Sequence, residues 1–455
     1  MLYPSMYNIS LPKGSDLLLF NTKSLYLGRV DRDAYYKAID FIEELNNGQM
    51  NSVDDSVKQV AFQLRQRGFL VPDQHEEKEE IVARFQRQKS QNTHMGLTIA
   101  PTENCNFACP YCYESTNSTV MTEETQDALL EHIEREFHLG VLSSMHITWY
   151  GGEPLMPRSF KAIKRMSSRI IQLCEKFKID YSSNIITNGY LLYEDVSRQL
   201  AECQVELVQI TLDGPRDLHN KTRILKNGQG SFDQILANIK AGKPYLRFSI
   251  RMNVDADNAD GVSDLKVLLK KEGVLNDAGR VALYISPVRS YTSSCKSSHC
   301  LSNNEFYRLQ LDLLMKGIND DGFFVVDDYP QEKQSVCTAV GKDSFVIGPD
   351  GSLYKCWLDL GQRELSVGAV EKDCLKLNDN LDRWTSFSPF EKGCSDCTML
   401  PVCMGGCPEL NMRSDGQAEN EACCNWKYVL KDHLSYIVDA RQKNCGVQSP
   451  VDSGG

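Results

Sequence analysis

The sequence predicts an α/β protein, in which a partial (β/α)6 barrel lies between a small N-terminal α+β domain of winged-helix-like character and a cysteine-rich C-terminal domain. Three observations support this prediction. Apolar strands alternate with helical stretches in the middle of the chain, short β-like runs and two helical patterns precede them, and most of the 17 cysteines follow them.

Residues 1–75 hold the elements of the N-terminal domain. Two short β-like runs come first, and a second helical pattern ends at a glycine. Residues 76–93 are expected to be a linker helix, because Asp73–Ser90 is dense in charge and lacks proline and glycine, which favours an exposed connecting helix. The strands expected in the domain are Tyr7–Leu11 and Leu17–Leu27, and the helices are Asp31–Asn46 and Ser56–Arg67.

Residues 94–290 are expected to form the barrel. Its strands are predicted at Met95–Ala100, Met145–Tyr150, Tyr181–Ile186, Leu207–Leu212, Leu246–Asn253 and Val281–Pro287. Its helices are predicted at Thr122–Phe137, Ser159–Phe177, Tyr193–Cys203, Phe232–Ala241 and Asp264–Lys271. Short connections favour a parallel sheet, which right-handed crossovers would curl. In such folds the functional side chains gather at the carboxyl ends of the strands.

The remaining chain is predicted to contain a bridging region, residues 291–335, and a cysteine-rich domain, residues 336–445. The bridging region holds Cys295, Cys300 and a helix expected near Asn303–Ile318. The cysteine-rich domain has little regular periodicity, as expected of a segment organised by metals. Residues 446–455 are expected to be a disordered tail.

The composition excludes several classes of protein. A net charge of −11 without a basic stripe argues against a nucleic-acid surface. No apolar run approaches the length of a membrane span, and no secretion signal is visible at the N-terminus, so we expect no membrane association and a cytoplasmic location. An odd number of cysteines in a reducing compartment indicates metal ligands before disulfides.

Cys105, Cys109 and Cys112 form a CxxxCxxC triplet directly after the first barrel strand. Three thiolates on one short loop can hold three irons of a 4Fe-4S cluster and leave the fourth iron open to a small molecule. A zinc site is the alternative, since Cys-x2-Cys also suits tetrahedral zinc. Zinc would require a fourth nearby ligand, and none follows in this loop.

The second barrel strand ends in Gly151-Gly152-Glu153-Pro154. Together with the cysteine triplet, this strand end resembles the radical S-adenosylmethionine (SAM) superfamily. The resemblance implies that the open iron binds the amino and carboxylate groups of SAM. It also implies that Gly151, Gly152 and Glu153 receive the methionyl amine and that Tyr111 lies near the adenine. Gly151-Gly152 alone would more often be an ordinary turn.

Two further strand ends fit the same resemblance. Thr187-Asn188-Gly189 ends the third strand, and a stretch with Asp213 and Arg223 follows the fourth. The superfamily often holds the ribose and the methionyl carboxylate at these ends, so Asn188, Asp213 and Arg223 are candidate SAM contacts. The alternatives are an ordinary turn at Asn188-Gly189 and a surface charge at Arg223.

The last third of the chain carries a second set of cysteines. In order, they are Cys337, Cys356, Cys394, Cys397, Cys403, Cys407 and the pair Cys423-Cys424, with Gly351 five residues before Cys356. Their spacing resembles the SPASM extension of radical SAM enzymes that modify peptides and proteins. Two structural zinc knots are the alternative interpretation of the same spacing.

The SPASM resemblance implies two auxiliary 4Fe-4S clusters with interleaved ligands. Cys337, Cys356 and Cys407 would hold the nearer cluster, and Cys394, Cys397, Cys403 and Cys423 the farther one. Cys424 is the alternative to Cys423. Cys423 is favoured because Trp426 lies three residues after it, and relatives commonly place an aromatic residue three positions after this ligand. The nearer cluster lacks an assured fourth ligand: Cys295 or Cys300 supplies it, or one iron stays open to a substrate thiolate.

The resemblance therefore implies a radical enzyme with SAM and three 4Fe-4S clusters. It implies cleavage of SAM to a 5′-deoxyadenosyl radical, abstraction of a substrate hydrogen, and transfer of one electron to the auxiliary clusters. The N-terminal domain resembles the leader-binding domains of ribosomal-peptide maturases and would bind a precursor leader at a sheet edge within Leu17–Leu27. We expect a thioether or carbon–carbon crosslink in the peptide and a flavodoxin- or ferredoxin-type electron donor.

Two other functions stay open at this point. A formylglycine-generating sulfatase maturase would carry an aspartate base directly after the second cysteine of the extension, whereas this chain has Trp357 there and Asp359 two residues later. The N-terminal domain could also be a cap without a binding role. A zinc-organised protein-binding scaffold is the non-enzymatic alternative.

Overall fold

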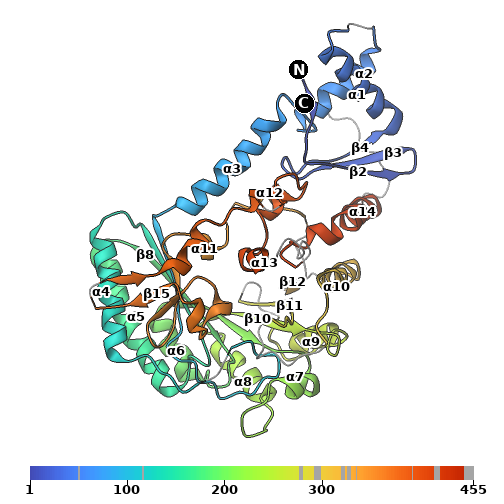
Figure 1. Ribbon diagram of the computed structural model, residues 1–455. Coiled ribbons are helices and arrows are strands. Elements are labelled where there is room, and N and C mark those ends of the chain that lie inside the picture. The colour runs from blue at the N-terminus through green and yellow to red at the C-terminus, as the bar shows by residue number, and fades with distance from the viewer. Residues whose placement is uncertain are drawn as a thin grey trace.

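The computed structural model describes residues 1–49, 52–114, 117–275, 280–291, 299–318, 323–324, 329–334, 336–372, 374–391, 393–413 and 421–444. Cys295, Cys445 and the tail at 446–455 lie outside the described residues. Figure 1 shows the barrel joined to the N-terminal domain through one long helix, with the cysteine-rich region between them.

Six parallel strands form the centre of the largest sheet, and they confirm the predicted partial barrel. They lie side by side in sequence order, each hydrogen-bonded to the next. The strands are β6 (His94–Ile99), β7 (Ser144–Trp149), β8 (Asp180–Thr187), β9 (Val205–Thr211), β10 (Arg247–Val254) and β11 (Val281–Pro287). Because all six run in the same direction, their carboxyl ends meet at one edge, where the predicted site residues lie.

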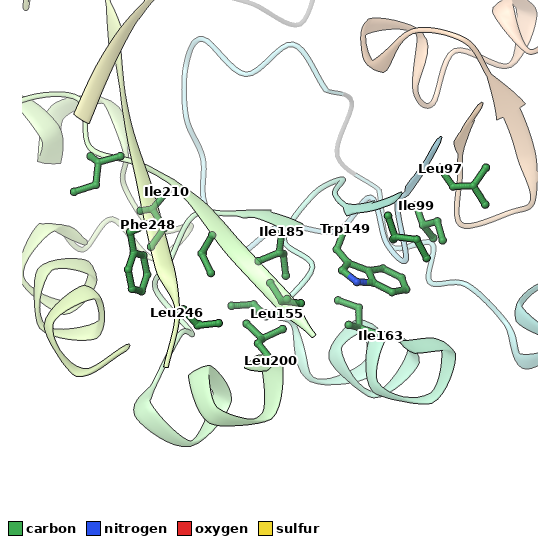
Figure 2. Close-up of a cluster of buried hydrophobic side chains, with 14 of the residues drawn as sticks. Leu97, Ile99, Trp149, Leu155, Ile163, Ile185, Leu200, Ile210, Leu246 and Phe248 are labelled. Atoms are coloured by element: carbon green, nitrogen blue, oxygen red, sulfur yellow. The ribbon is translucent and has the colours of Figure 1, made fainter. Parts of the chain in front are cut away.

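Helices cover the outside of this sheet. Figure 2 shows apolar side chains of this sheet facing the helices: Trp149 lies by Ile163 of helix α5 (Pro157–Phe177), and Ile185 lies on the side of Leu200 of helix α6 (Glu194–Glu202). All four are buried. The barrel helices are α4 (Glu123–His138), α5 (Pro157–Phe177), α6 (Glu194–Glu202), α7 (Arg216–Thr222), α8 (Phe232–Gly242) and α9 (Gly261–Lys271). Only α7 was not predicted.

The N-terminal domain is a small α+β unit. Strands β2 (Asn8–Lys13), β3 (Asp16–Asn21) and β4 (Leu27–Asp31) form an antiparallel sheet, and helices α1 (Arg32–Asn46) and α2 (Asp55–Gln66) pack against it. Strand β1 (Tyr3–Pro4) pairs with β5 (Leu70–Val71). Asp31 ends β4 and caps α1, since its carboxylate accepts a hydrogen bond from the Ala34 N–H at 2.9 Å.

The prediction of one edge strand over Leu17–Leu27 is wrong. The segment contains two strands, because the Asn21 side chain accepts hydrogen bonds from the N–H groups of Lys23 and Ser24 and so closes a turn. The first of these strands, β3, is paired on both sides, with β2 and with β4. Within the described residues, the sheet edges available to a peptide are those of β2 and β4.

The linker helix α3 (Gln74–Ser90) is confirmed as a helix, but it is not exposed on all sides. Glu77, Ile81 and Phe85 on one face are buried. The Phe85 ring packs edge-on against Phe390, with ring centroids 5.4 Å apart. The sequence did not reveal this apolar face, because its few apolar residues lie among many charged ones. The face packs α3 against the C-terminal region.

The cysteine-rich region contains more regular structure than its periodicity indicated. Strand β13 (Ser344–Ile347) pairs with β6 in parallel and so extends the barrel sheet, followed by β14 (Ser352–Tyr354), β15 (Gly368–Val370) and β16 (Leu375–Leu377). Strand β12 (Phe323–Phe324) extends the opposite side, next to β11. The helices are α10 (Asn303–Met315), α11 (Asp382–Thr385), α12 (Leu400–Cys403), α13 (Pro408–Arg413) and α14 (Trp426–Asn444). None of the helices in the described part of the chain is long and apolar enough to cross a membrane.

Candidate functional site

The cysteine loop follows β6 and is anchored at its centre by Phe107. The Phe107 ring is buried, and its backbone forms an antiparallel bridge with Leu225, in the segment after α7. The Phe107 N–H points back to Cys105 Sγ at 3.4 Å. This fold of the loop brings the three thiols near one another: burial raises the pKa of Cys112 to about 12, the Glu114 carboxylate adds to the shift, and Cys109 and Cys105 make smaller contributions.

The Gly151-Gly152 turn lies directly against this loop. Both glycines have left-handed backbone angles, with φ of 79° and 37°. A Cβ atom on Gly151 would lie 2.5 Å from Ala100 Cβ and 2.9 Å from the Thr102 carbonyl oxygen, and one on Gly152 would collide with the Asn104 carbonyl. Only glycine permits this approach of the β7 end to the loop after β6.

The Glu153 carboxylate connects the ends of β7 and β8. It is fully buried and accepts hydrogen bonds from Thr187 Oγ1 at 2.6 Å and from the Asn188 N–H at 2.8 Å. The side-chain amide nitrogen of Asn188, Nδ2, donates a hydrogen bond to Asn106 Oδ1 at 2.7 Å and lies 3.8 Å from Cys105 Sγ. Glu153 and Asn188 therefore lie directly beside the cysteine loop.

The Tyr111 hydroxyl connects the cysteine loop with the ends of β9 and β10. It donates a hydrogen bond to Asp213 and receives one from Arg223 Nη1 at 2.8 Å. Asn253 Nδ2 lies 3.3 Å from the same hydroxyl, and the Asn253 N–H donates to Asp213 Oδ1 at 3.0 Å. Asp213 and Arg223 are 1% and 8% exposed, and the Tyr111 hydroxyl connects these two buried groups of opposite charge.

The residues around the cysteine loop fit an anionic cluster with an amino-acid-like ligand. Burial raises the pKa of Cys105 to about 12, with Glu153 adding to the shift, so free thiolates are disfavoured here until bound iron supplies positive charge. Within the described residues, the buried Nε of Arg223 has no hydrogen-bond partner. A carboxylate such as that of SAM would satisfy this donor.

Cys337, Cys356 and Cys407, the predicted nearer group, are brought together by β13, β14 and α13. Burial raises the pKa of Cys407, and the Cys337 thiolate adds to this shift. Burial also raises the pKa of Cys356, to which Cys407 contributes. Cys300, a candidate fourth ligand, is partly exposed, and Cys295 falls outside the described residues.

The predicted farther group also assembles, around α12. Burial raises the pKa of Cys423 to about 11, with smaller contributions from the Cys403, Cys397 and Cys394 thiolates. Cys424 lies on the same side and hydrogen-bonds the Cys403 sulfur, which lowers the pKa of Cys403 to about 6. Cys423 therefore interacts electrostatically with all three other members of the group, as expected of the fourth ligand. Both Cys423 and Cys424 lie near Cys403.

Gly406 makes the contact between the two cysteine groups possible. Its φ is 68°, and a Cβ atom there would collide with the Ala422 carbonyl oxygen. The Cys407 N–H donates to that same carbonyl at 3.0 Å. The turn after Cys403 therefore places the end of the farther group directly before Cys407 of the nearer one.

Among the described residues, no three cysteine, histidine or carboxylate side chains converge as ligands of a single metal ion would. A 4Fe-4S cluster holds its thiolates farther apart, on separate irons. The ligand roles of the individual cysteines stay predictions.

Two residues of the site escaped the sequence-based prediction. Glu114 accepts a hydrogen bond from the Gly152 N–H at 2.8 Å, and Asn253 binds both Tyr111 and Asp213. Asn253 is the last residue of the predicted strand Leu246–Asn253, so inspection of every strand end would have found it. Glu114 carried no such signal, because its role depends on how the loop folds back on β7.

Comparison with known proteins agrees with this geometry. The model of the radical SAM superfamily matches residues 99–264, from the end of β6 into α9. The chain is a radical SAM enzyme. Its extension makes it one of the SPASM type, and SAM and a 4Fe-4S cluster are cofactors of this enzyme class.

The relatives of this radical SAM enzyme include maturases of proteins and peptides. A cysteine-type anaerobic sulfatase-maturating enzyme of Clostridium novyi is 27% identical over 377 residues, which cover 75% of this chain and 96% of the relative. The structure of anSMEcpe with bound AdoMet and Cp18Cys peptide covers 78% of this chain and 99% of that one, with a TM-score of 0.56 and 19% identity. The structure of Streptococcus suis SuiB bound to precursor peptide SuiA covers 93% and 99%, with a TM-score of 0.50 and 14% identity.

Proposed function

We propose that this radical SAM enzyme forms an intramolecular crosslink, a thioether or a carbon–carbon bond, in a precursor peptide whose leader binds the N-terminal domain. The observation that carries the proposal is the docking of the N-terminal sheet on the cysteine-rich extension. A peptide held by that sheet would lie beside the region that is proposed to carry the auxiliary clusters.

The docking is built from apolar contacts and hydrogen bonds. Leu18 and Phe20 share a buried cluster with Cys403 and Trp426. The Thr22 hydroxyl donates to the carbonyl of Thr398, next to the farther cysteine group.

The sheet offers a place for the leader. Strand β4 pairs only with β3 within the described residues, so its outer edge could take an extended leader as a further strand. The SuiB structure supports this assignment, because it contains a precursor peptide and covers 93% of this chain.

The chain's own residues would do three things in this reaction. Glu153, Asn188 and Arg223 would hold SAM, which when bound to the reduced cluster supplies a radical that abstracts a substrate hydrogen. The buried walls of the barrel would exclude water and stray hydrogen donors from the substrate radical. The two cysteine groups of the extension would hold the clusters that accept the electron released when the crosslink forms, and a flavodoxin- or ferredoxin-type donor would reduce the first cluster.

A formylglycine-generating sulfatase maturase is the second candidate. The C. novyi relative favours it, since it is a sulfatase-maturating enzyme that covers 75% of this chain. The residue after Cys356 argues against it. Trp357 stands where such maturases are expected to place an aspartate base, and its indole Nε1 donates to Thr98 Oγ1 at 3.1 Å. Asp359, two residues later, is 1% exposed and lies 3.6 Å from Arg413 inside the extension.

The experiment is an anaerobic incubation of the reconstituted, reduced enzyme with SAM and a precursor peptide encoded next to it. We expect a product lighter by two hydrogens, with the new bond located by tandem mass spectrometry. An aldehyde that reacts with a hydrazine reagent would instead establish formylglycine formation. An unchanged precursor despite SAM cleavage would count against both peptide-modifying functions.

The control for this assay is the triple variant in which Cys105, Cys109 and Cys112 are replaced by alanine. It should neither cleave SAM nor change the peptide, because the loop can no longer hold a cluster. A colourless protein that contains zinc and no iron or sulfide would contradict the enzyme proposal altogether.

A further inference from the structure

We propose that Glu114 is a positioning residue for SAM: its carboxylate fixes the peptide unit between Gly151 and Gly152 so that the Gly151 carbonyl faces the methionyl amine. The inference deepens the proposed function, because it assumes that SAM binds at this turn. It assigns a role to a residue that lies outside both the cysteine triplet and the Gly-Gly-Glu-Pro strand end.

Glu114 holds the turn from the side of the cysteine loop. It stands two residues after Cys112, and its Oε2 accepts a hydrogen bond from the Gly152 N–H at 2.8 Å. The Tyr150 hydroxyl, just before the turn, also hydrogen-bonds the Glu114 carboxylate. The carboxylate is therefore held on one side by the loop that carries the third cysteine and on the other by the end of β7.

Because the peptide bond is planar, the contact between Glu114 and the Gly152 N–H also fixes the direction of the Gly151 carbonyl. In a trans peptide the N–H and the C=O of one unit point in opposite directions, and the chain has no cis bond in its described part. When Glu114 holds the Gly152 N–H, the Gly151 carbonyl must point away from Glu114, toward the opposite side of the turn. That carbonyl is then available to accept a hydrogen bond from an ammonium group.

Glycine makes such a restraint necessary. Gly151 and Gly152 have φ of 79° and 37°, and glycine visits many other conformations at little cost. The neighbouring Glu153 cannot replace Glu114, because its carboxylate already accepts hydrogen bonds from Thr187, Asn188 and the Leu155 N–H. Glu114 is the carboxylate that binds the peptide unit itself.

The test compares two ligands on Glu114 variants by equilibrium binding to the anaerobically reconstituted protein, without turnover. SAM carries the methionyl amine, whereas 5′-methylthioadenosine lacks the whole amino-acid part. In E114A the Kd for SAM should rise about tenfold or more, which is the loss expected for one charge-assisted hydrogen bond. The Kd for 5′-methylthioadenosine should stay within about twofold of the wild-type value.

Two further variants separate positioning from folding. E114Q keeps an acceptor for the Gly152 N–H and should bind SAM within about threefold of wild type. E114D keeps the charge but shortens the reach, and it should weaken SAM binding as E114A does. E77A is the matched control: Glu77 is a buried carboxylate of α3 that accepts a hydrogen bond from the Ser5 hydroxyl at 2.8 Å in the N-terminal domain, so SAM affinity should be retained.

Iron content is measured on every variant, so that loss of the cluster is recognised. Equal weakening of both ligands in E114A and E114D at full iron content would overturn the inference, as would wild-type SAM affinity in both. Failure of the wild-type protein to bind SAM at all would instead contradict the proposed function, which keeps the two failures distinguishable.

Discussion

The indole ring of Trp357 packs over the phenol ring of Tyr150, with ring centroids 5.2 Å apart and an angle of 31° between the ring planes. Tyr150 directly precedes the Gly151-Gly152 turn, and Trp357 directly follows Cys356. One aromatic pair thus connects the cofactor side of the barrel with the nearer cysteine group. Strand β13, which pairs with β6, holds the two regions together on the other side.

We expect W357A to loosen this junction. The substitution removes the ring contact and the hydrogen bond to Thr98, so the free energy of unfolding should fall by about 2 kcal/mol. W357F keeps the ring contact and should lose about half as much. Urea denaturation followed by fluorescence measures both variants, and a W357A protein as stable as wild type would show that the pair contributes nothing.

G152A should abolish SAM binding. The added methyl group collides with the Asn104 carbonyl and forces the cysteine loop away from the turn. G228A is the matched control, because Gly228 also has a positive φ, of 84°, but no atom lies within 4 Å of the added Cβ. G228A should cost only about 1 kcal/mol of stability and leave the SAM Kd unchanged. Equal SAM affinity in the two variants would show that SAM binding does not need the close approach of Gly152 to the cysteine loop.

Sequence patterns predicted the barrel and the location of the site well, for a physical reason. The barrel strands alternate buried apolar residues with partly exposed ones, as in Arg247–Val254. Functional groups follow the carboxyl ends of such strands, so Cys105, Gly151, Asn188 and Asp213 could be placed relative to one another from the sequence. The cysteine-rich region could not be predicted in this way. Its strands are three or four residues long, and β13 is recognised only through its pairing with β6.

The N-terminal domain shows a second limit of the sequence patterns. Leu17–Leu27 has the composition of one strand, but Asn21 turns the chain inside it through two backbone hydrogen bonds. Such side-chain-to-backbone contacts have a weak sequence signal. Glu114 was missed for a related reason, because its partner Gly152 lies 38 residues away.

D213A should strongly destabilise the folded protein. Asp213 is the buried carboxylate beside Arg223, and its removal leaves a guanidinium that is 8% exposed without its charge partner. Breaking such a pair costs about 3–5 kcal/mol. The control is D233A, because Asp233 pairs with Arg216 on the surface, where both side chains are 58% exposed and the expected loss is about 0–1 kcal/mol. Similar losses in the two variants would show that Asp213 is not the partner that Arg223 requires.

His132 should make the stability depend on pH. Burial in α4 lowers the pKa of His132 to about 4, while an unfolded chain would titrate near 6.5. The folded state therefore binds fewer protons in this window, and the stability present above pH 6.5 is lost as the pH falls toward 4. Between pH 7 and pH 5 the free energy of unfolding should fall about 2 kcal/mol more in wild type than in H132Q. Parallel pH profiles for the two proteins would contradict this assignment.

F20A should disturb the farther cysteine group, although Phe20 is more than 370 residues away from it in the sequence. Phe20 lies on β3, is fully buried, and packs edge-on against Tyr329 with centroids 5.8 Å apart. It belongs to the same apolar cluster as Cys403 and Trp426, so its removal leaves a cavity beside the proposed cluster. We expect a loss of about 3–5 kcal/mol of stability and a lower iron content, by up to one cluster per chain.

The matched control for this prediction is F62A, on the same domain. Phe62 of α2 is 58% exposed, so its truncation should change the free energy of unfolding by less than about 0.5 kcal/mol and leave the iron content intact. Because Phe20 lies on the sheet proposed to take the leader, F20A should also weaken the binding of a precursor peptide. If F20A lost stability but kept all its iron, the sheet would support the fold of the extension without shielding its cluster, and the N-terminal domain would act on the peptide alone.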